Sequence, residues 1–96
     1  MSLYFVRHQH DAATCPARDP AMGSMLLAHI SPQNARKMGV IIHGDAVLDN
    51  QHTFVLILEA EAKAQVEQFM QPFAQAGSVE IWPASACETV VERAGC

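Results

Sequence analysis

Two histidines one residue apart, His8 and His10, follow an apolar stretch, and a Cys-Pro pair begins five residues later at Cys15. Imidazoles and thiolates suit Zn, Cu or Ni as ligands far better than they suit Mg or Ca. A His-x-His pair is also found at ordinary polar strand ends, and a free cysteine is commonly a small buried hydrophobe. Both interpretations are open until the elements that position these residues are considered.

The composition is that of a folded domain with an excess of acidic residues. Half of the 96 residues are hydrophobic, 17% are charged and the formal net charge is -4. We therefore expect a single domain over residues 1–96, with 84–96 as a C-terminal tail or arm. The six basic residues form no run, so we expect no nucleic-acid partner.

The chain shows no sign of a membrane or an export signal. No apolar run approaches the length of a membrane span, so we expect no membrane association. The start "MSLYFVRH" lacks the features of a signal peptide, and three widely spaced cysteines do not form a disulfide framework. We therefore expect a cytoplasmic protein with reduced thiols.

The apolar pattern predicts four strands and two helical regions. The strands are expected at residues 3–8, 40–48, 52–60 and 78–83. The helices are expected at residues 20–39, with a break at Ser31-Pro32, and at 59–77. Asp19 is expected to cap the first helix. The helical spacing predicts these residues for the core: Met22, Met25, Met38, Ala62, Val66, Phe69, Met70 and Phe73.

The order βαββαβ predicts an α+β, ferredoxin-like fold. Right-handed crossovers give a four-stranded antiparallel sheet in the order 4-1-3-2, with both helical regions on one face. Several strands are apolar on both sides, so the open face of the sheet needs a cover. A second copy of the chain is the simplest cover, and we expect a homodimer.

This topology brings the unusual residues together at one edge of the sheet. The end of the first strand and the start of the third lie side by side, which places His8 and His10 near His52 and the loop that carries Cys15. We therefore predict a metal site of His8, His10, Cys15 and His52, with Asp11 as a neighbouring acceptor or ligand. The predicted function is carrying, buffering or sensing Zn, Cu or Ni, with no organic cofactor.

The run from residue 39 to residue 85 resembles the YciI-like proteins of the dimeric α/β-barrel superfamily. The points of likeness are "GVIIHG", "ILEAE", "PFAQAG" and "VEIWP". The resemblance implies a ferredoxin-like fold and a dimer. The segment "HQHDAATCP" is similar instead to a group of uncharacterised barrel proteins that begin with His-x-His and continue to Cys-Pro, and related small barrels include metal-binding examples.

The resemblance also implies a second function, that of a cofactor-free enzyme or small-ligand binder. YciI-like proteins carry a proposed His-Asp pair, whose histidine matches His29 but whose aspartate position holds Gln71. An amide cannot serve as a carboxylate base. In this alternative His29 or His43 is the general base in the barrel cavity, with Arg7 as an anion contact.

Two further readings of single residues are open. His43 is expected on the strand face that also carries Ile41, Asp45 and Val47. Cys15 could act as a nucleophile activated by His8 or His10 rather than as a metal ligand.

Overall fold

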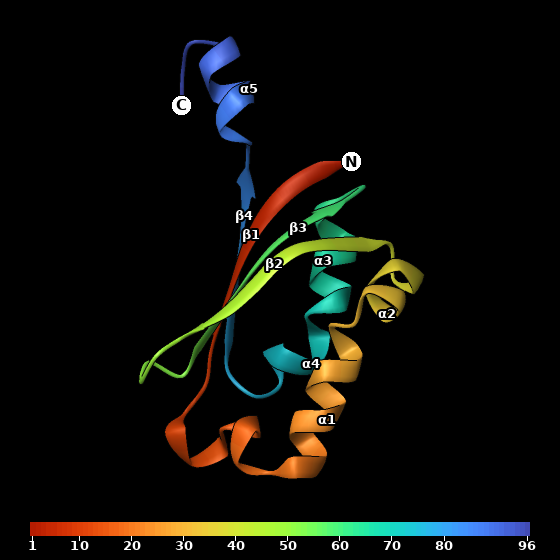
Figure 1. The fold of residues 1–96 in the computed structure, drawn as a ribbon, viewed down its shortest axis with the longest axis vertical. Coiled ribbons are helices and arrows are strands. Elements are labelled where there is room, and N and C mark those ends of the chain that lie inside the picture. The colour runs from red at the N-terminus through yellow and green to blue at the C-terminus, as the bar shows by residue number, and fades with distance from the viewer.

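Four antiparallel strands form one sheet in the order β2-β3-β1-β4 (Figure 1). A computed structural model describes residues 1–96. The strands are β1 (Ser2–Gln9), β2 (Val40–Leu48), β3 (Thr53–Ala60) and β4 (Ser78–Ala84). The predicted ferredoxin-like order of elements and the predicted strand neighbours are confirmed.

The helices between the strands lie on one side of the sheet (Figure 1). They are α1 (Pro20–His29), α2 (Pro32–Lys37), α3 (Lys63–Phe69) and α4 (Gln71–Ala74). Asp19 caps α1 as predicted, because its carboxylate accepts a hydrogen bond from the Ala21 backbone N–H at 2.9 Å. Ser31 caps α2 in the same way, so the predicted break between the two helices is confirmed.

The core lies between the sheet and α3. Alternate residues of β1 and β3 point toward the helices, as the period of two predicts. Those of β1 are Tyr4, Val6 and His8, and those of β3 are Phe54, Leu56 and Leu58. They are buried with Val66, Phe69 and Met70 of the second helical region, which were predicted for the core.

Three residues predicted for the core are exposed. Ala62 precedes α3 in extended backbone, so it does not join the buried stripe of that helix. Met22 and Met25 are 46% and 72% exposed, and α1 has no buried residue at all. Helical spacing indicates that side chains share a face, but only the end of α1 at His29 reaches the core, where its ring stacks on Phe69.

A β-bulge in β2 overturns the prediction that His43, Asp45 and Val47 share a face. Ile42 pairs with Leu58 and Gly44 pairs with Ile57, which leaves His43 as the extra residue. The bulge shifts the alternation by one position. Asp45 and Val47 therefore lie on the face that the helices cover, whereas His43 lies on the open face beside Glu59.

The open face of the sheet carries large apolar side chains. Ile57 and Trp82 are 47% and 42% exposed, and the Phe5 ring packs against Trp82 with 5.8 Å between ring centroids. Arg7 pairs with Glu80 on the same face. The tail forms a short helix, α5 (Cys87–Glu92), which projects from the end of the sheet opposite the β1–α1 loop (Figure 1).

None of the helices combines the length and the apolar character needed to cross a membrane.

Candidate metal centre

The last residues of β1 and the first residues of β3 meet at one end of the sheet. Gln9 pairs with Thr53, and one step further the backbone N–H of His10 donates to the carbonyl oxygen of His52 at 3.1 Å. His52 was expected inside the strand, but it lies in the turn before β3 with a φ of 47°. The predicted neighbourhood of His10 and His52 is confirmed.

Cys15 reaches this edge because the chain after β1 folds into two short 3-10 turns. The turns cover Ala12–Thr14 and Pro16–Arg18, and Cys15 stands between them. The Cys15 N–H donates to the Ala12 carbonyl at 3.4 Å, and Pro16 begins the second turn with its fixed φ. The Cys-Pro pair is thus a turn element that also presents a thiol.

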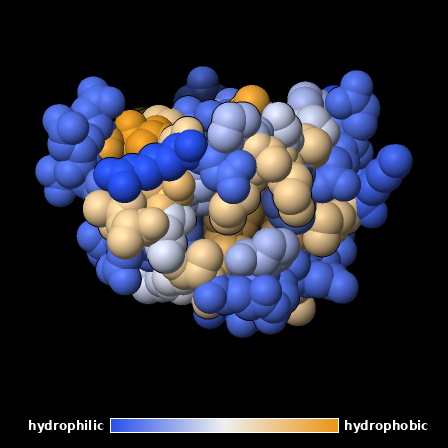
Figure 2. Space-filling model, turned by 90° about the horizontal axis from the view of Figure 1, so that it is seen from below, coloured by the Kyte–Doolittle hydropathy of each residue, from blue (hydrophilic) through white to orange (hydrophobic).

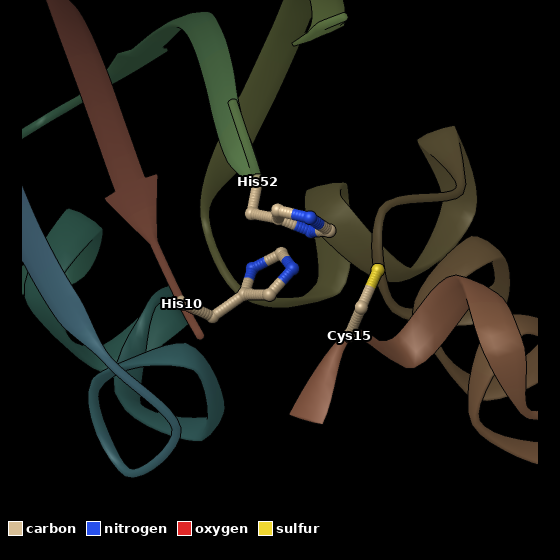
Figure 3. Close-up of side chains that lie close together, drawn as sticks. All are labelled: His10, Cys15 and His52. Atoms are coloured by element: carbon tan, nitrogen blue, oxygen red, sulfur yellow. The ribbon is translucent and has the colours of Figure 1, made fainter. Parts of the chain in front are cut away.

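The side chains of His10, Cys15 and His52 point toward one another (Figure 3). One ligand atom from each, two imidazole nitrogens and the thiol sulfur, lie within 4.8 Å of one another. Ligand atoms on a tetrahedral zinc ion are roughly 3.3–3.8 Å apart, given bond lengths of about 2.0–2.3 Å. Modest side-chain rotations would therefore bring the three atoms to one ion.

The imidazole of His10 has neither of its nitrogens hydrogen-bonded. Both Nδ1 and Nε2 are buried and have no partner. A buried polar group without a partner costs free energy, so native proteins seldom keep one without a role. Coordination of an ion by one of these nitrogens is a role that this position can serve.

His8 adjoins the cluster without belonging to the three-residue group. Its side chain is buried, and its ring stacks on His10 with 5.3 Å between ring centroids. Nδ1 lies 3.0 Å from the carbonyl oxygen of Ser78, which can only accept, so Nδ1 carries the proton. Nε2 is left with a lone pair, and the edge of the Phe73 ring packs against the imidazole.

Both stacked histidines favour the neutral form. Burial is the main cause that lowers the pKa of His8, the nearby His10 lowers it further, and the hydrogen bond to Ser78 acts in the opposite direction. Burial also lowers the pKa of His10, with a contribution from His52, whereas the charge of Asp11 raises it. Neutral imidazole is the form that binds metals.

The cluster opens into a cavity of about 260 Å³. Figure 2 views this end of the molecule, where a recess with apolar walls lies among hydrophilic side chains. One wall is apolar, the histidines and Cys15 form another, and Asp49 and Asn50 of the β2–β3 turn complete the lining. The apolar wall consists of Pro16, Leu26, Val47, Leu48, Phe54 and Phe73.

The alternative general bases lie away from this cluster. The ring of His29 stacks on Phe69, and its Nε2 donates to the Phe69 carbonyl oxygen at 2.8 Å. Nε2 of His43 lies 3.1 Å from Oε2 of Glu59 on the open face of the sheet. Arg7 lies on that face too, with its guanidinium 5.6 Å from the centre of the Trp82 ring, so it does not line the histidine cavity.

Sequence reasoning did not identify the apolar wall of the cavity. Phe73 was assigned to a helical core stripe, and Val47 to the same strand face as His43. The bulge at His43, which turns Val47 toward the cavity, has no signal in the sequence other than the adjacent Gly44.

The comparisons with known proteins leave the site to be interpreted from its geometry, since no family model and no curated protein matches this chain.

Proposed function

We propose that this protein binds one transition-metal ion, Zn, Cu or Ni, through His10, Cys15 and His52, and that it carries, buffers or senses that ion. The observation that supports this most is the convergence of three ligand atoms within 4.8 Å from three separate segments. Two of these segments are joined by the sheet, and the third arrives from the β1–α1 loop.

His8 supports the site from the side. Its Nδ1 donates to Ser78, its ring stacks on His10, and its Nε2 lone pair is free to accept a hydrogen bond. Partners of this kind fix the orientation of a metal-binding imidazole and tune its affinity.

Elemental analysis of the purified protein after metal loading tests the proposal. We expect about one ion per chain in the wild type, as in a mononuclear site. The variants His10→Ala and Cys15→Ser should lose the ion, whereas His43→Ala removes a histidine from the opposite face and should retain it. Equal metal content in all four proteins, or none in the wild type, contradicts the proposal.

We also propose that the protein is a homodimer whose open sheet faces pack together. The exposed Ile57 and Trp82 and the partly buried Phe5 support this, because such side chains gain free energy when they leave water. Its solution mass should be twice that of the chain, and Ile57→Asp should yield monomers. A monomeric wild type contradicts this part of the proposal.

The resemblance to YciI-like proteins supports a second candidate, a cofactor-free enzyme or ligand binder. The structure adds one observation in its favour, the contact between His43 and Glu59 at 3.1 Å. A carboxylate that holds an imidazole is a common arrangement for a general base. Under this candidate His43→Ala abolishes ligand binding and leaves metal content unchanged. The metal-site proposal expects instead that His10→Ala loses the metal ion.

A further inference from the structure

The metal cluster and the apolar cavity lie side by side, and their combination specifies more than metal binding. His10, Cys15 and His52 line the cavity themselves, so an ion held by them faces its interior. Sites with three protein ligands keep a fourth position for water or substrate, whereas structural zinc sites have four protein ligands. We infer that a divalent ion here binds a small monoanionic ligand with a short apolar tail. This inference rests on the proposed metal site.

The charge of the site favours a monoanion. A divalent ion held by two neutral imidazoles and one thiolate has one net positive charge. Asp49 also lines the cavity, but its side chain is exposed to solvent, so it does not neutralise an ion that faces the apolar interior. A charge beside apolar surface is costly, and a single negative charge on the fourth ligand removes that cost. Cu(I) with the same three ligands is already neutral, so it has no such preference.

The cavity walls favour an apolar tail. Leu26 and Phe54 approach from the helix and the sheet, and Phe73 closes the space between them and His8. Val47 and Leu48 form the rim. A volume of about 260 Å³ corresponds to roughly nine water molecules' share of liquid, which accommodates a chain of a few carbons beside its anionic head.

Leu26 and Leu27 provide a matched pair of positions for testing the tail. Both are leucines of α1, but Leu26 lines the cavity whereas Leu27 is 68% exposed and does not. The substitution Leu26→Asn should weaken binding of the tail without touching a metal ligand, and Leu27→Asn should have no effect.

Titration of the Co(II)-loaded protein with acetate, butyrate and hexanoate tests the inference. Co(II) reports thiolate ligation in the near ultraviolet and coordination changes in the visible region. We expect the visible spectrum to change on titration, with affinity rising about fourfold for each methylene that enters the cavity. In Leu26→Asn this dependence on chain length should be largely lost, whereas Leu27→Asn should behave as wild type.

The outcomes separate the two proposals. A thiolate band that is present in wild type but insensitive to every carboxylate retains the metal site and overturns the inference. Equal affinity for acetate and hexanoate also overturns it, because the apolar wall then has no function in binding. Absence of the thiolate band, with no Co(II) retained, overturns the proposed function and the inference with it.

Discussion

The backbone N–H of His10 donates a hydrogen bond to the carbonyl oxygen of His52, with 3.1 Å between nitrogen and oxygen. This bond continues the β1–β3 ladder one step beyond the paired residues Gln9 and Thr53. Two of the three proposed ligands are therefore held together by the sheet, independently of their side chains. The third, Cys15, comes from a loop that the sheet does not hold.

The backbone at His52 leads to a first prediction. Its φ of 47° is in the left-handed region, where glycine is favoured and a side chain costs about 1–2 kcal/mol. His52→Ala and His52→Gly should both lose the metal ion. The metal-free glycine variant should be more stable than the alanine variant by about 0.5–1 kcal/mol, as measured by urea unfolding.

The comparison between the two variants separates a ligand role from a backbone role. If His52 serves only to form the turn, the glycine variant should bind metal as well as the wild type does. Metal content measured on both variants decides this, and full occupancy in His52→Gly contradicts the proposed ligand.

The position of Cys15 leads to a second prediction, about the segment from Asp11 to Ile30. Within it α1 has no buried residue, and Leu27 is exposed. An ion that joins Cys15 to the sheet would hold this segment closed. Loading with Zn should therefore slow tryptic cleavage after the exposed Arg18 by about tenfold or more, since a ligand that binds only the closed state suppresses opening.

Arg93 and Cys15→Ser provide the controls for this experiment. Arg93 lies beyond α5 at the other end of the molecule, so cleavage after it should not respond to Zn. The Cys15→Ser variant should be cleaved after Arg18 at the same rate in the presence and in the absence of Zn. Equal protection of wild type and variant would show that Cys15 does not link the segment to the ion.

The sequence predicts the fold and the convergence of His10 with His52 because both follow from strand order. The alternation of apolar residues predicts which side chains of β1 face the helices. The antiparallel pairing of β1 and β3 predicts that the end of β1 lies beside the start of β3. The cap at Asp19 and the break at Ser31 follow from local hydrogen bonding, which depends on a few adjacent residues.

The missed features depend on long-range packing. The bulge at His43 reverses which side chains of β2 face the cavity, and Gly44 is the only local residue that indicates it. The exposure of Met25 depends on how α1 lies relative to the sheet, which helical spacing does not determine. The His8 side chain is held by its bond to Ser78, which is far away in the sequence although it lies in the neighbouring strand β4.

The lowered pKa values of His8 and His10 lead to a third prediction, for the metal-free protein. The folded state binds these protons more weakly than the unfolded state does. The free energy of unfolding should therefore be highest at a pH above the histidine pKa of the unfolded chain, about 6.5, and should fall as the pH drops through that value. The slope contributed by each group is at most about 1.4 kcal/mol per pH unit.

Urea unfolding at several pH values between about 7.5 and 5 measures this dependence. The His8→Phe variant keeps an aromatic ring beside His10 and Phe73 but has no imidazole proton, so its stability should fall less steeply on acidification. Stability that rises as the pH falls would contradict the assignment of both histidines as buried and neutral.

The thiol of Cys15 leads to a fourth prediction, which separates metal binding from nucleophilic chemistry. Cys87 and Cys96 are exposed and remote from the cluster, so iodoacetamide should label them at the same rate in all samples. Cys15 should be labelled in the metal-free protein and protected after Zn loading, with labelling restored by a chelator. Mass spectrometry of the peptides measures each site.

If Cys15 is labelled equally fast with and without Zn, it is not a ligand. Rapid labelling that is lost in His10→Ala would then favour the reading of Cys15 as a thiol nucleophile activated by a neighbouring imidazole.

Gly77 leads to the last prediction, because it touches the strand that presents His10. A Cβ at Gly77 would overlap the carbonyl oxygen of Gln9 and lie 3.1 Å from the Cα of His10. Both contacts are with backbone, which cannot move aside without shifting the end of β1. Gly77→Ala should therefore reduce the free energy of unfolding by about 1–3 kcal/mol and weaken metal binding by shifting His10 relative to Cys15.

Gly44→Ala is the matched control, since a Cβ at Gly44 meets no atom within 4 Å. It should leave metal affinity unchanged, as measured by competition with a chromogenic chelator. A Gly77→Ala protein that is destabilised but binds metal with wild-type affinity would show that the end of β1 does not set the position of the ligand. Such a result would mean that the His52 turn and the Cys15 loop alone determine the positions of the ligands.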